Sequence, residues 1–483
     1  MSDAAPNVGK PVAGKENHAT AILQIGHKSH FASLLPREVQ YTGNIKMSLL
    51  DLLSRPQVWE TFYDYKTSLA CPKDIERQMR GFLDAQRYLP VCDLIQNISI
   101  LQEFPLPRKS IISKQSTPKK RTVYTYPAAE NTVLKLLTFL LLRTYDGLFC
   151  DNLYSFRPGK SAKDAIRSLR QIPNLYQKYS YKVDVSNYFN SIPVERLLPE
   201  LETVLKDDPR LFTFLKTLLT EPYVIDGGKP CHNVSHGRKK APVTDALMEE
   251  ADRDEIDMEE ALIIKEQKGI MAGTPLASFY ANLYLRDMDQ FFFDQGIPYA
   301  RYSDDVIVLG DTMEEVQTHA ETIRSFLAAK GLSINSKKEE YHTPEEGFVF
   351  LGFSLKKGVI DVSPVSVKKI KQKMRRKTRA LQRWQHRNDL SGEKAAKAFI
   401  RVFHRKLLES SAENDLSWSF WYFPTINTDE SLRIIDLYAQ ECLRTLLTGR
   451  HTKARFDARY ADLKSLGYQT LVHAYHDFRK NAN

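Results

Sequence analysis

Two adjacent carboxylates, Asp304 and Asp305, follow an apolar-tending run and precede the β-branched run 306–309. An Asp-Asp pair is also a common turn dipeptide between strands. A third acid, Asp184, ends a second strand-like run far upstream, and this favours a chemical role. Three carboxylates brought together would supply the oxygen ligands that Mg²⁺ prefers. Two such cations can activate an attacking oxygen and stabilise a leaving oxygen in a phosphoryl transfer.

Two strands must position these acids. The run 299–310 predicts a hairpin with Asp304 and Asp305 at its tip, and the run 181–185 predicts the strand near Asp184. Like charges this close repel and raise each other's pKa unless a cation lies between them. We therefore expect the three acids to share divalent cations.

The run Tyr302-Ser303-Asp304-Asp305 resembles the signature of reverse transcriptases, and Asp184 lies in what resembles another palm motif of that family. The segment 269–285 resembles the family's template-contacting glycine loop and the helix after it. The three motifs stand in the family's order. The resemblance implies an α+β right-hand polymerase with fingers, an antiparallel-sheet palm and a helical thumb, extended by helices at both ends.

The same resemblance implies the catalytic set. Asp184 and Asp304 would bind two Mg²⁺ ions, or Mn²⁺ in their place, with Asp305 as a supporting ligand and the carbonyl of Val185 adding one bond. Lys338 resembles the lysine that protonates the departing pyrophosphate. Lys337 is the competing choice, and a plain surface lysine is the alternative.

Nucleotide contacts are implied in the same way. By position, Arg121 and Arg157 resemble the arginines that hold the incoming triphosphate, and a guanidinium fork suits phosphate oxygens. Phe189 resembles the aromatic that blocks a ribose 2′-hydroxyl, although a core phenylalanine would look the same. Gly273 belongs to the glycine loop, where an absent side chain lets backbone approach a nucleotide closely.

Further residues resemble nucleic-acid contacts. Ser278 begins the helix after the glycine loop, and Gly352 lies in a run that resembles the primer grip, although apolar packing would also explain that run. The segment 366–387 carries ten basic residues and no acid, with one apolar stripe, as expected of a helix that offers cations to a phosphate backbone. A solvated basic helix is the alternative. The phosphate contacts predicted here are Lys368, Lys371, Arg375, Arg376 and Arg379.

The bulk properties agree with a nucleic-acid partner. The 483 residues carry a formal net charge of +10, which suggests a polyanion, nucleic acid or acidic membrane. The five cysteines are scattered without a CxxC pair, as in reduced cytosolic proteins. Cys231, His232 and His236 are weak candidates for metal ligands, because no second cysteine pair accompanies them. No apolar run reaches the length of a membrane span, so we expect a cytoplasmic protein.

Composition divides the chain into regions. An acidic stretch, 245–260, lies within an insertion between palm motifs, and a solvated loop, an oligomer contact or a flap that excludes nucleic acid would each explain it. The expected regions are a flexible tail at 1–30, a helical N-terminal region at 31–105, fingers at 106–183, a palm at 184–364 with an insertion at 226–267, and a thumb with a helical C-terminal region at 365–483.

One departure from the family pattern bears on biology. Met271-Ala272 replaces the usual Pro-Gln of the glycine loop, and an alanine there resembles the bacterial defence-associated and abortive-infection reverse transcriptases. This implies an RNA-directed DNA polymerase of antiviral defence that copies a dedicated non-coding RNA into DNA from dNTPs, as a monomer or a homo-oligomer. The alternatives are a retron or group II intron-type enzyme, or a maturase-like RNA-binding protein.

Overall fold

The computed structural model describes residues 47–68, 71–97, 103–113, 120–226, 262–335, 338–408, 418–450 and 454–482. The chain divides into Met1–Ser48 and one compact unit, Leu49–Asn483, which contains every element discussed below. The expected tail and the acidic stretch lie outside the described residues, as do Lys337, Cys231, His232 and His236.

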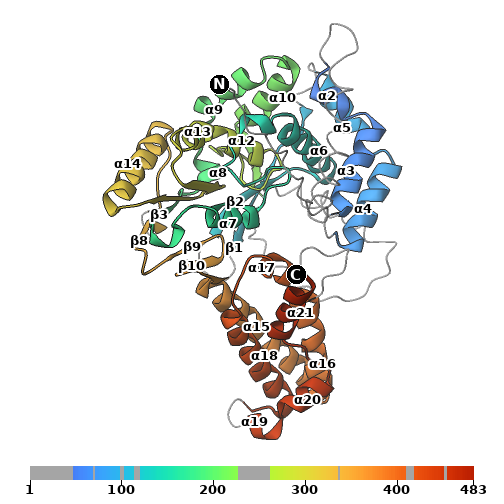
Figure 1. Cartoon of the computed structure of the whole chain (residues 1–483). Helices are drawn as coiled ribbons and strands as arrows, with labels where there is room; N and C mark the ends of the chain where they lie inside the picture. Colours follow the sequence, from blue (N-terminus) through green and yellow to red (C-terminus); the bar gives the residue numbers. More distant parts are fainter. Residues whose placement is uncertain are drawn as a thin grey trace, which may run out of the picture. The chain divides into compact units, whose positions relative to one another are not determined.

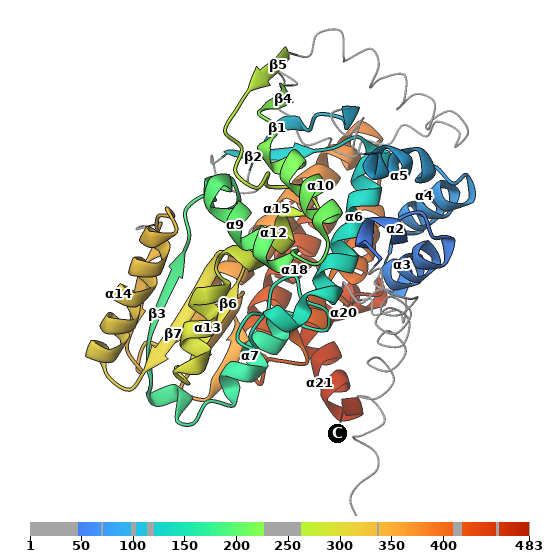
Figure 2. The same ribbon diagram turned by 90° about the horizontal axis from the view of Figure 1, so that it is seen from above.

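One four-stranded sheet carries the predicted catalytic acids (Figure 1). In spatial order its strands are β6 (Tyr299–Tyr302), β7 (Asp305–Gly310), β3 (Tyr179–Asp184) and β8 (Glu340–His342). Each neighbouring pair is antiparallel, as predicted for the palm. The apolar run 306–309 is buried throughout, because helices cover the sheet. Helix α14 (Met313–Ala329) packs against β3 and β7 (Figure 2), and helix α7 (Ala162–Arg170) shares a core with Ile307 and Leu309.

A second sheet includes strands from both ends of the predicted insertion. Its order is β2 (Lys120–Thr125), β1 (Arg108–Ser113), β4 (Tyr223–Asp226) and β5 (Leu262–Lys265). β1 and β4 run parallel, and the other two pairs are antiparallel. Asp226 pairs with Leu262, so the two ends of the predicted insertion 226–267 are joined as strands of one sheet.

Helix α6 (Ala128–Thr144) follows β2 in the chain and packs against α12. Eight of its residues are buried, more than the one apolar stripe of a surface helix, because it is covered on several sides. Three predicted N-terminal helices pack against it: α2 (Leu49–Leu52), α3 (Pro56–Ser68) and α5 (Leu89–Gln96). The fourth, α4 (Lys73–Asp84), packs against α3.

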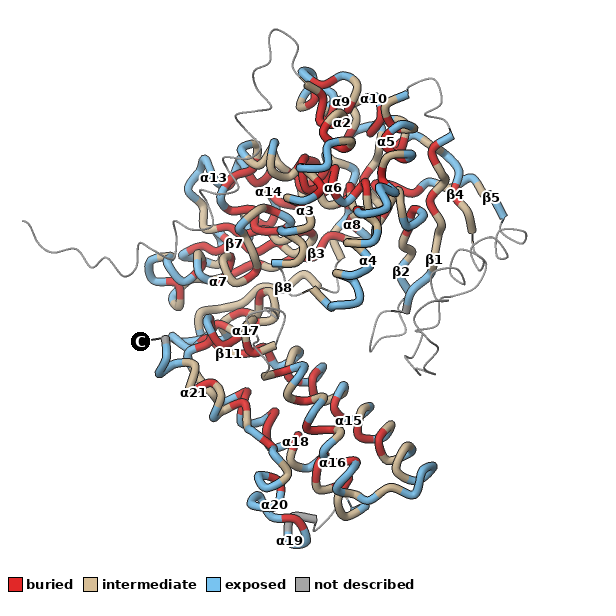
Figure 3. Tube along the Cα trace, turned by 90° about the vertical axis from the view of Figure 1, so that its right-hand side faces the viewer, coloured by how far each residue is buried: buried red, intermediate tan, exposed pale blue. Residues whose placement is uncertain are grey.

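The basic segment forms helix α15 (Pro364–Arg387), which follows a small antiparallel sheet of β9 (Phe348–Phe350), β10 (Phe353–Lys356) and β11 (Val359–Val362). Pro364 occupies the first helical position, and the Ser363 hydroxyl caps the helix by accepting from the Ser366 N–H at 3.2 Å. The apolar stripe is buried against α16 (Gly392–Phe403) and α18 (Glu430–Thr448), as Figure 3 shows. We call the helices from α15 onward the thumb.

The other helices connect these parts. Around the sheets they are η2 (Asp146–Leu148), η3 (Leu175–Gln177), α8 (Tyr188–Ser191), α9 (Val194–Val204), α10 (Pro209–Thr220), α12 (Ala277–Tyr284) and α13 (Arg286–Asp294). In the thumb they are the π-helix η5 (His404–Leu408), α17 (Trp418–Tyr422), α19 (Ala454–Asp457), α20 (Tyr460–Ser465) and α21 (Leu471–Ala482). Within the described ranges, no helix combines the length and apolar character needed to cross a membrane.

Candidate active site

The three predicted acids lie at one edge of the β6-β7-β3-β8 sheet. Asp184 and Asp305 are paired directly across β3 and β7. The Val185 N–H donates to the carbonyl of Asp304 at 3.1 Å, so the turn that carries Asp304 lies against the end of β3. Asp184 is 8% exposed and the other two are half-buried. Side chains 120 residues apart in the sequence are thus brought to one place.

Burial and repulsion affect the protonation of these acids. Burial raises the pKa of Asp304, and the carboxylate of Asp184 raises it further. The pKa of Asp305 is raised to about 6, first by burial and then by Asp304 and Asp184. Carboxylates that disfavour each other's charge in this way are stabilised by a cation between them.

Lys338 supplies one positive charge at this site. Its ammonium donates to Oδ1 of Asp184, while its side chain stays 41% exposed. The placement puts an N–H donor beside the acids, where the predicted role in protonating pyrophosphate requires it. That role stays a prediction.

The donor set fits hard divalent cations. Among the described residues, no group of three or more His, Cys, Asp and Glu side chains is arranged, as it stands, to hold a metal ion. One of the three acids, Asp184, is bonded to Lys338 instead. Carboxylate oxygens are nevertheless the ligands that Mg²⁺ prefers, and the pKa values of Asp304 and Asp305 are raised by burial and then by their anionic neighbours. Asp184, Asp304 and Asp305 are therefore the residues that would hold the cations.

A buried ion pair that the sequence-based prediction missed supports the turn. The side chains of Arg301 and Asp289 are 0% and 1% exposed. Nε and Nη2 of Arg301 donate to the Asp289 carboxylate at 2.7 and 2.5 Å, and Nη1 donates to the carbonyl of Ser303 at 3.3 Å. Burial lowers the pKa of Arg301, but Asp289 outweighs burial and raises it. The guanidinium therefore stays charged and anchors the residue before the acids.

The turn also depends on Ser155. Ser303 has a φ of +61°, a left-handed conformation that L-residues adopt at a cost. Its N–H donates to the Ser155 hydroxyl at 2.8 Å, and that hydroxyl donates to the side chain of Asn282 at 3.1 Å. A charged residue, Arg301, inside an otherwise apolar strand was the sequence signal that could have pointed to this support.

Phe189 lies on the short helix α8, directly after β3. Its half-buried ring meets the ring of Phe156 edge-on, with centroids 6.4 Å apart. The preceding Tyr188 is buried, and its hydroxyl donates to the carbonyl of Ala281 at 2.6 Å. The position of Phe189 is therefore fixed from α12, while its role as a sugar gate stays a prediction.

The glycine loop joins α8 to strand β2. Gly269 has a φ of +55°, and a Cβ there would lie 2.6 Å from backbone atoms of Phe189 and Asn190. The Asn190 side chain accepts from the Ala272 N–H at 2.9 Å and donates to the carbonyl of Thr122 at 3.2 Å. The Tyr124 N–H donates to the carbonyl of Ala272 at 2.8 Å. Asn190, which the sequence analysis did not single out, thus ties three segments together.

Gly273 and Ser278 lie on either side of the start of α12. At Gly273, φ is +102° and a Cβ would lie 3.0 Å from the carbonyl oxygen of Tyr124, so only glycine fits against β2 without strain. The Ser278 hydroxyl donates to the carbonyl of Pro275 at 3.0 Å. Their predicted contacts with nucleotide and template stay predictions.

The two predicted triphosphate arginines differ in their surroundings. Arg121 is exposed on β2, and its charge lowers the pKa of Asp304, which places it near the acids. Arg157 is only 8% exposed, and its guanidinium donates to the Asp146 carboxylate at 2.7 and 3.1 Å and to the carbonyl of Cys150 at 2.6 Å. The guanidinium of Arg157 is therefore engaged within the protein, and its predicted phosphate contact stays a prediction.

Gly352 also has neighbours that the sequence did not predict. Its φ is +89°, and a Cβ would lie 2.8 Å from the hydroxyl of Tyr422 in the thumb. The close approach that this glycine permits is therefore to Tyr422, whereas contact with a primer stays a prediction.

The predicted phosphate contacts of the thumb lie along α15. Lys371 is half-buried, with its ammonium 4.8 Å from the ring centroid of Tyr438 on α18. The others are exposed: Lys368, Arg375, Arg376 and Arg379.

Four of the five cysteines are described, and all four are free thiols, as predicted: Cys71, Cys92, Cys150 and Cys442.

The family model described as reverse transcriptase (RNA-dependent DNA polymerase) matches residues 112–355. No curated protein sequence matches the chain. Two apo telomerase structures from Candida tropicalis show similarity to it. The form truncated from the C-terminal domain is 12% identical over 54% of this chain and 55% of that chain, with a TM-score of 0.39. The other is 10% identical over 79% and 64%, with a TM-score of 0.41.

Telomerase from Candida albicans, in complex with a fragment of telomeric RNA, is 12% identical over 77% of this chain and 65% of that chain, with a TM-score of 0.35. The chain thus spans between 55% and 65% of the lengths of these telomerases. The family match is more extensive, since residues 112–355 make up just over half of the 483 residues and include all three acids. The right-hand polymerase fold is thereby confirmed, and the chain belongs to the reverse transcriptase family.

Proposed function

We propose that this chain is an RNA-directed DNA polymerase, in which a primer 3′-hydroxyl attacks the α-phosphate of a dNTP and pyrophosphate departs. The observation that carries the proposal is the meeting of Asp184, Asp304 and Asp305 at one sheet edge, beside the ammonium of Lys338. Divalent cations held by the three acids would supply charge stabilisation and activation of the attacking oxygen. The protein's own side chains would orient the triphosphate, exclude a ribose 2′-hydroxyl and give a proton to pyrophosphate.

Four residues have distinct tasks in this proposal. Arg121 is exposed near the acids and would orient the triphosphate. Phe189 would exclude a ribose 2′-hydroxyl by occupying its space. Lys338 would leave Asp184 and give a proton to the departing pyrophosphate. Asn190 would keep Phe189, the glycine loop and β2 in fixed relation through its two hydrogen bonds.

The experiment is primer extension on an RNA template with Mg²⁺, comparing the wild type with Asp304→Asn and Asp305→Asn. We expect both variants to lose dNTP incorporation while keeping RNA binding. Asp311→Asn is the matched control, because Asp311 follows the same strand but is ion-paired to Lys178 at 2.6 Å, away from the acids. Retained synthesis in either active-site variant would refute the proposal.

A second readout does not depend on catalysis. A cation that binds only the folded protein raises its melting temperature. Mn²⁺ should therefore raise the Tm of the wild type and of Asp311→Asn, but not of a variant in which Asp184, Asp304 and Asp305 are all replaced by Asn. An equal rise in the triple variant would remove these acids as the ligands.

We further propose that the template is a dedicated non-coding RNA and that the enzyme acts in antiviral defence. Support comes from Ala272 in the glycine loop and from the run Tyr188-Phe189-Asn190-Ser191-Ile192, which resemble that group. Sequencing the RNA that copurifies with the chain and the DNA that it makes should show one RNA species and its copy. A retron-like or intron-derived RNA would favour those enzymes, and bound RNA without any DNA product would favour a maturase-like protein.

A further inference from the structure

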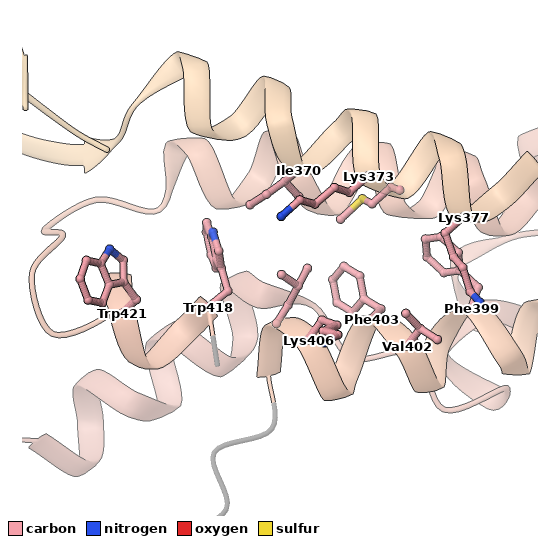
Figure 4. A pocket seen from close by; sticks show the side chains of 11 residues that line it. Ile370, Lys373, Lys377, Phe399, Val402, Phe403, Lys406, Trp418 and Trp421 are labelled. Carbon is pink, nitrogen blue, oxygen red and sulfur yellow. The ribbon is translucent and has the colours of Figure 1, made fainter. Parts of the chain in front are cut away.

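The thumb contains a pocket of about 520 Å³ between α15, α16, η5 and α17 (Figure 4). Its apolar lining comes from buried side chains of two facing helices, Ile370 and Met374 on α15 and Phe399 and Phe403 on α16. Its volume lies within the range of about 300–1,000 Å³ that ligand pockets usually have. A helical bundle with its core filled would not leave this space.

The charged groups around the pocket all have one sign. The ammonium-bearing side chains of Lys373, Lys377 and Lys406 line it, and Lys373 and Lys406 are exposed. Among the described residues that line the pocket there is no carboxylate. Three cations, with no anion among the described residues of the lining, favour a negatively charged ligand.

Aromatic rings form the remaining wall. Trp418 and Trp421 on α17 are both half-buried, so part of each indole is accessible. Figure 4 shows both indoles at one end of the pocket, with the Lys373 side chain extending along its helix toward Trp418 and the Phe403 ring projecting from the facing helix. The wall also includes Lys406 and Leu407 of the π-helix η5, a distortion that is frequent at functional sites.

We propose that this pocket binds an unpaired nucleotide of a single-stranded nucleic acid. The base lies against Trp418 and Phe403, and the neighbouring phosphates are held by Lys373, Lys377 and Lys406. Aromatic platforms combined with cations are the usual means of holding single strands. The described lining offers no amide, hydroxyl or carboxylate side chain to read a base edge or a 2′-hydroxyl. The site is therefore tolerant of sequence and accepts DNA and RNA alike.

This site is separate from the phosphate contacts predicted elsewhere on α15. Lys371 lies over the ring of Tyr438 on α18. Burial raises the pKa of this tyrosine, and the charges of Arg375 and Arg379 oppose that rise. Those cations belong to the α18 flank of the helix. Lys373 and Lys377 face α16 and the pocket. The thumb thus has one flank for a continuous backbone and another for a single strand.

Tryptophan fluorescence of the full chain tests the proposal without requiring catalysis. The chain has four tryptophans, of which Trp59 is only 1% exposed. In a Trp384→Phe background, we expect oligothymidylate and oligouridylate to quench the emission similarly, and a duplex of equal length to quench it much less. Trp418→Leu should weaken single-strand affinity about fivefold to a hundredfold, the usual effect of losing one stacked base.

Salt dependence tests the lysines. Replacing Lys373 and Lys377 together by Gln should reduce the slope of log affinity against log salt by about 1.4, since each phosphate contact on a single strand contributes about 0.7. The matched control replaces Lys394 and Lys397 by Gln, because both are exposed on α16 and neither lines the pocket. The control should change the slope far less.

Three outcomes would overturn the proposal. The first is binding of the strand, seen by anisotropy, without quenching. The second is an equal loss of slope in the pocket variant and the Lys394 and Lys397 control. The third is quenching and displacement of the strand by a peptide of the chain's own residues 245–260, which would show that an acidic protein segment is the occupant instead.

Discussion

The contact between Gly269 and α8 gives the sharpest test of the site's construction. Gly269→Ala adds one methyl group at a position where φ is +55°. The added Cβ would lie 2.6 Å from the carbonyl oxygen of Phe189 and 2.6 Å from the carbonyl carbon of Asn190. Carbon atoms in favourable contact are about 3.5–4.0 Å apart. Because backbone atoms cannot rotate away, either the glycine loop or α8 must move.

The expected magnitude has two parts. A left-handed conformation costs an L-residue about 1–2 kcal/mol. Crowding of a packed interior by one methyl group adds about 1–3 kcal/mol. Gly269→Ala should therefore destabilise the protein by about 2–5 kcal/mol. Gly296→Ala is the matched control, because φ there is +63° and nothing lies within 4 Å of the added Cβ. It should cost only the first part, about 1–2 kcal/mol.

Two measurements follow from this difference. Thermal unfolding should give a clearly lower Tm for Gly269→Ala than for Gly296→Ala. The ratio of kcat/KM for a deoxynucleotide to that for a ribonucleotide should fall only in Gly269→Ala, because the displaced backbone carries Phe189. Equal Tm values with an unchanged ratio would refute the reasoning, since the loop would then tolerate the methyl group without moving α8.

Four other substitutions separate catalytic from structural roles. Phe189→Ala should raise ribonucleotide incorporation, and an unchanged preference for deoxynucleotides in single-nucleotide kinetics would remove Phe189 as the gate. Arg121→Ala should raise KM for dNTPs without a change in Tm. By contrast, Arg157→Ala should lower the stability by about 1–3 kcal/mol. The Asp146 carboxylate would lose its partner, and because it is only 34% exposed, water would screen its charge only in part. An increase in KM with unchanged Tm for Arg157→Ala would instead support its predicted phosphate contact. Arg301→Lys should lower the stability by about 3–5 kcal/mol and reduce activity. One ammonium cannot replace the forked guanidinium, which is bonded to both Asp289 and the Ser303 carbonyl. A Tm like that of the wild type would contradict this expectation.

The sequence predicted the palm sheet and its acids because the relevant signals are local. The apolar run 306–309 and the acids before it indicate a buried strand with a polar tip, and the antiparallel register of β3 with β7 confirms the strand pairing. The apolar stripe of α15 was equally readable, because Ile370, Met374 and Leu381 recur at helical spacing and are buried.

Arg157 shows where local signals fail. Its neighbours in the sequence, Phe156 and Pro158, do not reveal that Asp146 lies within 2.7 Å of its guanidinium. An arginine that binds phosphate and one that holds a loop together look alike in a sequence, because the donors are the same and only the acceptor differs. The neighbour of Gly352 was equally hidden from local signals, since Tyr422 is 70 residues away and belongs to another element.

The buried pair of Arg301 and Asp289 suggests how the turn is kept in a strained shape. Ser303 adopts a left-handed φ in a two-residue turn, where glycine would be easier. The Arg301 guanidinium, from β6 of the same hairpin, donates to the carbonyl of Ser303, and Ser155, from outside the hairpin, accepts from its N–H, so both backbone polar groups of the strained residue are satisfied by side chains. A buried charge pair is a weak source of net stability, because desolvation opposes the attraction. In this protein the pair of Arg301 and Asp289 fixes the backbone immediately before Asp304. It thereby fixes the distance between carboxylates that repel one another.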